Sequence, residues 1–200
     1  MNVLDLYAGY GERRRKDIES MGHKYTTLDI NPKFNCDTTM DVMKITQLDD
    51  YDFIWASPPC QAFSVAKIGY HWNIDNTPKS KDAEQSILLV EHTIKLLKKS
   101  SKKWIIENPR GKLRKLSIMD GIDRDTVTYC QYGDSKMKPT DIWHNGINWN
   151  PRPMCKNGDP CHTSAPRGSR TGSQEYMSAA ERSVVPLELW IEILKSAEES

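Results

Sequence analysis

The chain has 200 residues, a formal net charge of +1 and a mean hydropathy of −0.67, which suits one soluble domain with a sizeable core. Because no apolar run approaches the roughly 20 residues of a membrane span and the first residues show no signal-peptide pattern, we expect a cytoplasmic protein that binds no membrane. The five cysteines, an odd number, argue against a secreted disulfide framework, and a charge near zero leaves any affinity for nucleic acid to local basic clusters.

Strand-like and helix-like segments alternate over the first two thirds of the chain. Apolar runs predict strands at 2–8, 24–30, 51–57, 103–108 and 125–131. The segments between them are a charged stretch at 12–21, a short helix near 40–48 and an amphipathic helix at 82–99, and a last helix at 186–197 follows Pro186. This alternation predicts an α/β fold: a doubly wound, largely parallel sheet with helices on both faces.

The composition divides the chain into three parts. Residues 145–178 are rich in Gly, Pro, Asn, Ser and Arg and show little periodicity. We therefore expect a core at 1–144, a small irregular insertion at 145–180, and a C-terminal helix at 181–200 that completes the core. Basic residues gather at 12–16, 95–115 and 167–170, which favours a polyanionic polymer as partner, although a solvated surface explains such runs equally well.

The first strand runs into the stretch DLYAGYGE, residues 5–12. Ligands of open α/β sheets bind beyond the carboxyl ends of the strands, and Gly9 and Gly11 permit a tight turn against one. Asp29 ends the second strand, where a carboxylate can accept from ribose hydroxyls, and Asp41 is placed for an adenine amino group; either aspartate alone could instead cap a turn. ATP and NAD are disfavoured because their phosphate-binding motifs are absent, so an adenosine-type cofactor is predicted.

A single cysteine follows two prolines in YDFIWASPPCQAFS, residues 51–64. Pro58 and Pro59 cannot continue a sheet ladder, so they hold Cys60 rigidly beyond the carboxyl end of a strand. Such a mount suits a nucleophile that must meet one atom of a substrate. The alternative is a half-buried, inert thiol.

Four segments in order carry a resemblance to a known family. DLYAGYGE (5–12), SPPCQAFS (57–64), ENP (107–109) and QYGDSKMKP (131–139) resemble motifs of DNA (cytosine-5)-methyltransferases, over about 1–143 and the final helix. The resemblance implies a Rossmann-like methyltransferase sheet, S-adenosyl-L-methionine as methyl donor and DNA, duplex or single-stranded, as partner. The target base is then flipped out of the helix. The small size suggests a compact, bacteriophage-like member.

The resemblance also implies roles for individual residues. Cys60 adds to C6 of cytosine, Glu107 stabilises the adduct at N3 and the exocyclic amine, Asn108 positions the Glu107 backbone, and Lys138 takes the place of an arginine that holds the base. The donor would contact Leu6, Tyr7, Ala8, Gly9, Gly11, Asp29, Ile30, Asp41, Val42, Pro59, Arg182 and Ser183. DNA would contact Gln61, Ser64, Lys67, Arg110, Lys136, Arg167 and Arg170. The segment 62–80 would close over the base, with His71 and Trp72 as further contacts, unless it is a plain surface loop.

Three departures from the family leave alternatives open. The stretch KMKPT has Lys136, Lys138 and Thr140 where the family has a glutamine and two arginines. The chain has no room for a full target-recognition domain, so RNA or a free cytosine nucleotide, help from a protein partner, or a non-catalytic binding role remain alternatives. The stretch RSVVP puts Arg182 and Ser183 beside the donor, where a cation would suit a carboxylated donor.

The insertion contains its own cluster of metal-ligand residue types. Cys155, Cys161 and His162 lie in it, and Cys130 ends a strand that could lie nearby. Thiolates and imidazoles are the ligands that zinc prefers, and a small irregular segment gains most from such a staple. The sequence therefore suggests a structural zinc site, with reduced, unliganded thiols as the alternative.

Overall fold

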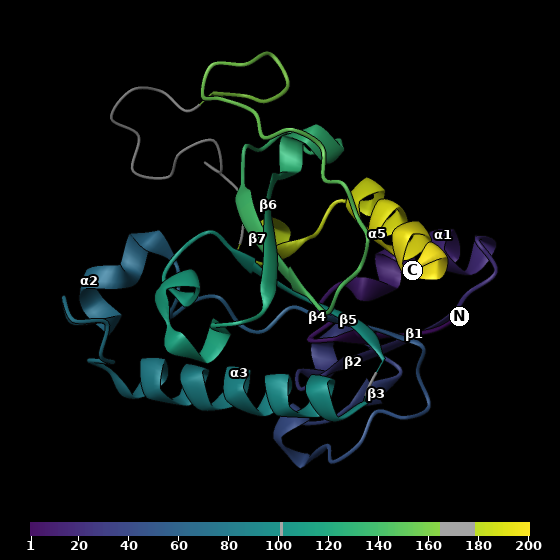
Figure 1. Cartoon of the computed structure of the whole chain (residues 1–200), viewed down its shortest axis with the longest axis horizontal. Helices are drawn as coiled ribbons and strands as arrows, with labels where there is room; N and C mark the ends of the chain where they lie inside the picture. The colour runs from purple at the N-terminus through teal and green to yellow at the C-terminus, as the bar shows by residue number, and fades with distance from the viewer. Residues whose placement is uncertain (101, 165–178) are drawn as a thin grey trace.

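The computed structural model describes residues 1–100, 102–164 and 179–200, in which seven strands form one sheet in the order β3-β2-β1-β4-β5-β7-β6 (Figure 1). The strands are β1 (Asn2–Leu6), β2 (Lys24–Asp29), β3 (Thr38–Thr39), β4 (Phe53–Ala56), β5 (Lys103–Pro109), β6 (Asp123–Thr128) and β7 (Pro139–His144). The α-helices are α1 (Arg15–Ser20), α2 (Ile68–His71), α3 (Lys81–Ser100), α4 (Ala179–Ser183) and α5 (Leu187–Glu199). Short 3-10 helices lie between them: η1 (Gly11–Arg14), η2 (Pro32–Phe34), η3 (Val42–Lys44), η4 (Val65–Lys67), η5 (Leu113–Lys115), η6 (Ser117–Met119) and η7 (Tyr129–Tyr132).

The sheet has a parallel half and an antiparallel end. Strands β3, β2, β1, β4 and β5 run parallel, so their carboxyl ends meet at one edge. Strand β7 runs antiparallel to both of its neighbours, β5 and β6. The first residues of β7 therefore lie at the same edge as the last residues of β5, with Pro109 opposite Thr140.

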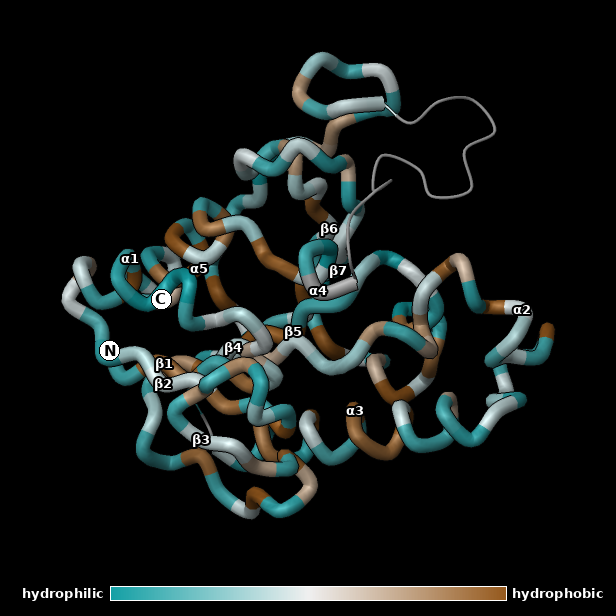
Figure 2. Tube along the Cα trace, turned by 180° about the vertical axis from the view of Figure 1, so that it is seen from behind, coloured by the Kyte–Doolittle hydropathy of each residue, from teal (hydrophilic) through white to brown (hydrophobic). Residues whose placement is uncertain are grey.

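Alternate residues of the central strands face two separate cores. On one face Leu4, Leu6 and Ile54 pack with the apolar stripe of α3. On the other face Val3, Phe53 and Trp55 pack with α1 and α5, and the Trp55 and Trp190 rings stack 3.8 Å apart. Figure 1 shows α3 on one side of the sheet and α1 and α5 on the other, and the predicted covering of both faces is confirmed. Figure 2 shows hydrophobic residues concentrated where these helices meet the strands.

The predicted strands and the two long helices are found within a few residues of their expected bounds. The sequence analysis missed β7, because the segment opens with a proline and carries Asp141 in its middle. That aspartate is fully buried and is held by Arg114, whose Nη2 lies 2.6 Å from Asp141 Oδ1. The strand predicted at 125–131 ends at Thr128 and continues as η7, and the helix expected near 40–48 is the single turn η3.

The described part of the insertion, residues 145–164, contains no helix or strand. Its first half nevertheless packs against α5, because Trp149 is buried and its Nε1 donates to Glu192 at 2.9 Å. Arg152 adds ion pairs to Glu188 and Glu192. Among the described residues, no helix is both long enough and apolar enough to cross a membrane.

Candidate active site

One pocket lies at the carboxyl edge of the sheet. It is formed by the residues that follow β1 and β4, by the end of β5, by the start of the β7 segment and by the chain before α5. Its lining includes Asp5, Tyr7, Ala8, Gly9, Tyr10, Arg14, Pro59, Cys60, Gln61, Glu107, Lys138 and Ser183. The pocket thus brings together residues of all four motif segments and of the RSVVP stretch.

The turn after β1 leaves open space on the pocket side. Gly9 has a positive φ of 52°, and a β-carbon at this position would meet no atom within 4 Å. Its amide donates to Asp29 Oδ2 at 3.0 Å, which ties the turn to the end of β2. Gly11 is closed in instead, since a β-carbon there would lie 2.9 Å from Asp5 Oδ2. The open face at Gly9 fits the close approach of an adenosine-type donor.

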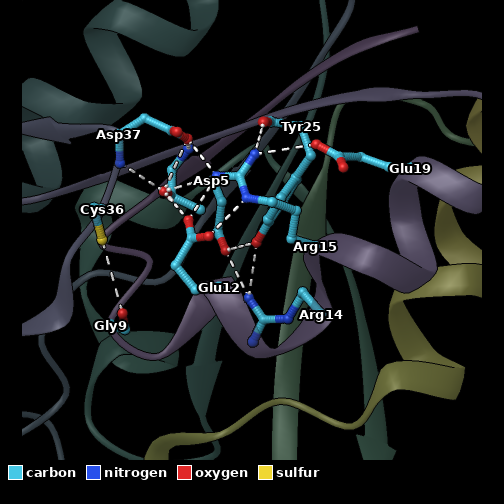
Figure 3. A network of polar contacts seen from close by, with 10 residues as sticks. Asp5, Gly9, Glu12, Arg14, Arg15, Glu19, Tyr25, Cys36 and Asp37 are labelled. Carbon is cyan, nitrogen blue, oxygen red and sulfur yellow. Dashed lines mark hydrogen bonds and ion pairs between the residues drawn. The ribbon is translucent and has the colours of Figure 1, made fainter.

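A buried ion pair lies beneath this turn (Figure 3). Arg14 Nη1 lies 2.6 Å from Asp5 Oδ2, and the Tyr25 hydroxyl donates to the same oxygen at 2.5 Å. Burial raises the pKa of Asp5 to about 6, although Arg14 and Tyr25 act in the opposite direction. Figure 3 also shows Arg15 in a more exposed set of ion pairs with Glu12, Glu19 and Asp37, which joins the buried pair through a bond from Arg15 Nη1 to the Tyr25 carbonyl at 2.7 Å. Arg14, at the pocket wall, was not predicted, because its sequence context is an ordinary charged run.

The loop that carries Cys60 is held from two directions. Asn108 Nδ2 donates to the Pro58 carbonyl at 2.9 Å, and the amides of Phe63 and Ser64 donate to the Cys60 carbonyl at 3.0 and 2.9 Å. The role expected for Asn108 was to position the Glu107 backbone. In the structure its amide nitrogen also holds the loop before the thiol, so Asn108 links β5 to the segment that carries Cys60.

Cys60 lies among charged groups of both signs. Burial raises the pKa of the Cys60 thiol, and the negative charge of Glu107 raises it further, whereas Lys138 and Arg182 lower it. A thiol in this environment is mostly protonated near neutral pH, so its reaction requires a driven proton transfer. Glu107 itself is 5% exposed at the end of β5.

The sequence analysis missed a buried tyrosine beside Glu107. The Tyr129 hydroxyl donates to Glu107 Oε1 at 2.7 Å, and burial together with the charge of Glu107 raises the tyrosine pKa well above its usual value. Lys138 Nζ lies 4.6 Å from the centre of the Tyr129 ring and donates to the Arg182 carbonyl at 3.0 Å. The available signal was weak: Tyr129 stands at the end of a strand beside Cys130, outside every motif.

Several residues expected to bind the donor lie outside the pocket wall. Leu6 and Val42 are buried in the core, and the Leu6 carbonyl accepts from the Ser57 amide. Asp29 accepts from the backbone at Gly9 and Asn31, and Asp41 caps η3 by accepting from the Met43 amide. Ile30 is 63% exposed. Of these residues Asp29 contacts the turn, whereas the predicted residues that line the pocket are Tyr7, Ala8, Gly9, Pro59 and Ser183.

The expected DNA contacts separate into exposed and buried groups. Gln61, Lys67 and Arg110 are exposed and Ser64 is half-buried, whereas Lys136 is buried and its Nζ lies 3.0 Å from Asp134 Oδ2. His71 and Trp72, suggested as further DNA contacts, are both buried, with His71 bonding to Ser80 and Trp72 Nε1 donating to the Ala62 carbonyl. Arg167 and Arg170 lie outside the described residues.

The four predicted metal ligands come together in a second site. The Sγ atoms of Cys130, Cys155 and Cys161 and a ring nitrogen of His162 lie within 4.8 Å of one another. Individual separations are 3.0 Å between Cys130 and Cys155 Sγ, 3.6 Å between Cys130 and Cys161 Sγ, and 3.6 and 3.8 Å from His162 Nδ1 to Cys161 and Cys155 Sγ. Zn–S bonds of 2.3 Å in a tetrahedron place sulfurs roughly 3.8 Å apart, so the cluster has the size of a zinc site.

Comparisons with known proteins show what the chain is similar to. No family model matches the chain. A protein of Frog virus 3 (isolate Goorha), named Probable DNA (cytosine-5)-methyltransferase, is 26% identical over 168 residues, which cover 80% of this chain and 78% of that protein. Among solved structures, the Entamoeba histolytica methyltransferase EhMeth has a TM-score of 0.50 at 14% identity, covering 77% of this chain and 56% of that one. The S. pombe Dnmt2 methyltransferase has a TM-score of 0.46 at 17% identity, covering 77% and 53%.

The chain thus spans little more than half the length of these two solved proteins, and at such identities the likeness to EhMeth concerns the fold. The sheet order and the pocket at its carboxyl edge show a Rossmann-like fold of the kind seen in methyltransferases such as EhMeth. The family that the chain resembles is that of the DNA (cytosine-5)-methyltransferases, so the resemblance predicted from the motifs is confirmed by the viral relative.

Proposed function

We propose that the protein transfers a methyl group from S-adenosyl-L-methionine to C5 of cytosine in DNA. The observation that carries the proposal is that Cys60, Glu107 and the open turn at Gly9 line one pocket. A nucleophile, an acid and a donor site are the three elements that this chemistry requires. When bound, S-adenosyl-L-methionine supplies an electrophilic methyl group.

The proposed reaction begins at the thiol. The Cys60 thiol gives its proton to water as Sγ forms a bond to C6. The electrons of the C5–C6 double bond move into the ring, and Glu107 stabilises the resulting charge at N3 and the exocyclic amine. C5 can then accept the methyl group as the sulfonium carbon–sulfur bond breaks toward sulfur. Loss of the C5 proton to a base and departure of Cys60 restore the double bond. Lys138 takes the place of the arginine that contacts the base.

A duplex hides C6, so the reaction on duplex DNA needs the target base outside the stack. The segment 62–80 after the nucleophile carries apolar side chains that face solvent, among them Val65, Tyr70 and Ile74, which are 67%, 70% and 104% exposed. Such side chains can fill the vacated stack. Gln61, Ser64, Lys67 and Arg110 are the proposed polar contacts to DNA, together with Lys136, whose ion pair with Asp134 would have to open.

The test is a nucleoside mass analysis of DNA from cells that express the chain, with the Cys60→Ala variant as control. One added methyl group on cytosine, absent from the control, is the expected result. Purified protein should also form a covalent adduct with a 5-fluorocytosine oligonucleotide and donor, and Cys60→Ala should abolish the adduct. Equal methylation by both proteins would refute the nucleophile assignment.

Other outcomes identify the alternatives. An adduct on RNA but not on DNA would move the proposal to an RNA substrate, and a free cytosine nucleotide is tested in the same assay. A substituent heavier than methyl would indicate a carboxylated donor near Arg182 and Ser183. Donor binding with no adduct on any substrate would indicate a non-catalytic homologue or a required protein partner.

We further propose that Cys130, Cys155, Cys161 and His162 bind a structural zinc ion. Its support is the four-ligand geometry, with three thiols and one imidazole within 4.8 Å. The ion would staple the insertion at 145–180 to the core at 1–144, while 181–200 completes that core. Elemental analysis of the purified protein should find about one zinc per chain, and Cys155→Ser should lose it. A metal content near zero in wild-type protein purified without chelator would end this proposal.

A further inference from the structure

The hydroxyl of Tyr129 is the feature that the proposed reaction does not yet use. It donates to Oε1 of Glu107 at 2.7 Å, and the tyrosine is 0% exposed while Glu107 is 5% exposed. A hydrogen bond to a carboxyl group in so dry a place is stronger than one in water. Its orientation therefore constrains how the carboxyl group can turn.

The bond distinguishes the two oxygens of Glu107. An oxygen that accepts from a phenol is occupied as an acceptor, so a proton that Glu107 carries or shares resides on the other oxygen, Oε2. Oε2 then keeps both of its lone pairs for N3 or the exocyclic amine of a base, whereas one lone pair of Oε1 is already engaged by the tyrosine. The tyrosine thus selects one of two otherwise equivalent orientations of the acid.

The tyrosine is itself held rigidly. Its ring lies under Lys138, whose Nζ is 4.6 Å from the ring centre, and its amide donates to the Lys138 carbonyl at 3.3 Å. Its own carbonyl accepts from the Asp134 amide at 3.2 Å. A tyrosine whose backbone is hydrogen-bonded on both sides and whose ring is covered can position a partner group with little loss of conformational entropy.

We propose that Tyr129 is a positioning residue that holds Glu107 Oε1 and directs Oε2 toward the target base. This inference rests on the proposed cytosine methylation and deepens it, because it identifies the group that orients the carboxyl of Glu107. Tyr129 need not touch the substrate and acts through Glu107.

The chain offers a matched control in the same 3-10 turn. Tyr132 is 1% exposed, and its hydroxyl accepts from the Arg152 amide at 3.0 Å and lies 3.4 Å from Glu192 Oε1, away from Glu107. Tyr129→Phe and Tyr132→Phe each remove one buried hydroxyl from η7. Both should lower thermal stability, but only Tyr129→Phe should change the chemical step.

The experiment measures kcat, KM for DNA and donor affinity for wild type, both tyrosine variants, Glu107→Gln and the double variant Tyr129→Phe/Glu107→Gln. Tyr129→Phe should lower kcat by about 10- to 100-fold, since a hydrogen bond to a charged group is worth about 1.5–3 kcal/mol, with donor affinity unchanged. In the Glu107→Gln background the same change should have little further effect, because the group it positions is already altered.

Equal kcat in wild type and Tyr129→Phe would overturn the inference, as would a loss matched by Tyr132→Phe. So would an undiminished effect in the Glu107→Gln background. If wild type fails to methylate any substrate, the proposed function fails instead. Infrared difference spectra against Glu107→Gln then still test the contact: the Glu107 carboxylate band should move in Tyr129→Phe and stay in Tyr132→Phe, and an unmoved band in both would refute it.

Discussion

The parallel half and the antiparallel end of the sheet each build one wall of the same pocket, the parallel wall and the antiparallel wall, and they do so in different ways. In the parallel half, the turn at Gly9, the Cys60 loop and Glu107 all follow or end strands that run in the same direction, so the sheet alone delivers them to one edge. At the antiparallel end, Tyr129 and Lys138 lie in the connection between β6 and β7. Both strands that flank this connection pair antiparallel, so the sheet order alone does not bring its residues to the pocket.

The difference shows in what fixes each wall. The parallel half rests on strands whose alternate residues pack into two apolar cores, with the buried ion pair Asp5–Arg14 beneath the turn. The antiparallel end carries the Arg114–Asp141 ion pair on β7 and the cluster of three thiols and His162 beside η7. The strands of the sheet therefore position the parallel wall, whereas the β6–β7 connection is held by the Arg114–Asp141 ion pair and the thiol and imidazole cluster.

Breaking the ion pair under the parallel wall should have the largest effect. In the native protein Arg14 Cζ lies 4.8 Å from the centre of the Trp190 ring. Arg14→Met keeps an apolar side chain over that ring but leaves the Asp5 carboxylate buried without its cation. Loss of one partner of a buried pair costs about 3–5 kcal/mol of unfolding free energy. Urea unfolding measures it, and Arg15→Met, in the more exposed network, should cost about 1 kcal/mol or less. Equal losses in the two variants would contradict the role of burial.

The loss in Arg14→Met should also depend on pH. The pKa of Asp5 is already raised by burial to about 6 in the folded protein, against an ordinary value of 3.8, so protons bind the folded state more tightly and stability falls as pH rises from about 4 to about 6. Without Arg14 the folded pKa rises further, and the decline continues above pH 6. The variant should therefore be more strongly destabilised, relative to wild type, at pH 8 than at pH 5.

Metal removal tests the staple of the antiparallel wall. If the thiol and imidazole cluster holds zinc, the metal-loaded protein is more stable than the stripped protein by about 2.7 kcal/mol when free zinc is 100 times its Kd. Thermal unfolding with and without chelator measures the difference, and the chelator should have no effect on Cys155→Ser. An unchanged melting temperature of the wild-type protein in chelator would show that zinc does not stabilise the antiparallel wall.

The parallel wall is also the part that could be predicted from the sequence. Gly9, Pro59, Cys60 and Glu107 stand at the ends of apolar runs, and the rule that ligands bind at the carboxyl edge brings them together without any knowledge of side-chain packing. The metal ligands were predicted by residue type alone. Their convergence depends on how residues 145–164 return to η7, which no local pattern specifies.

The antiparallel wall could be predicted only in part. Lys138 was found through the family motif, but β7 was missed because Asp141 interrupts its apolar pattern, and only a partner from a distant segment, Arg114, makes that aspartate compatible with a central strand. Tyr129 was missed for the same reason: its significance lies in a contact with a residue 22 positions earlier. Periodicity and motifs do not predict polar contacts between buried residues that are far apart in the sequence, such as Arg114–Asp141 and Tyr129–Glu107.

The parallel wall contributes a negative charge near Cys60 and the antiparallel wall a positive one, and the smallest predicted effect is on the pKa of this thiol. Burial raises the pKa of the thiol, Glu107 raises it further and Lys138 lowers it. In the protein without substrate, Glu107→Gln should shift the pH midpoint of Cys60 alkylation by iodoacetamide downward, and Lys138→Met should shift it upward. Mass spectrometry of the Cys60 peptide separates this thiol from the other four.

This prediction separates thiol reactivity from catalysis. At pH 8 the Glu107→Gln thiol should react faster with iodoacetamide than the wild-type thiol, because a larger fraction of it is ionised. The same variant should nevertheless turn over more slowly, since the charge that suppresses the thiolate in the resting enzyme comes from the group proposed to stabilise the adduct. If Glu107→Gln slowed both alkylation and turnover, Glu107 would favour the Cys60 thiolate, and the opposite effects assigned to Glu107 and Lys138 on the thiol pKa would be wrong.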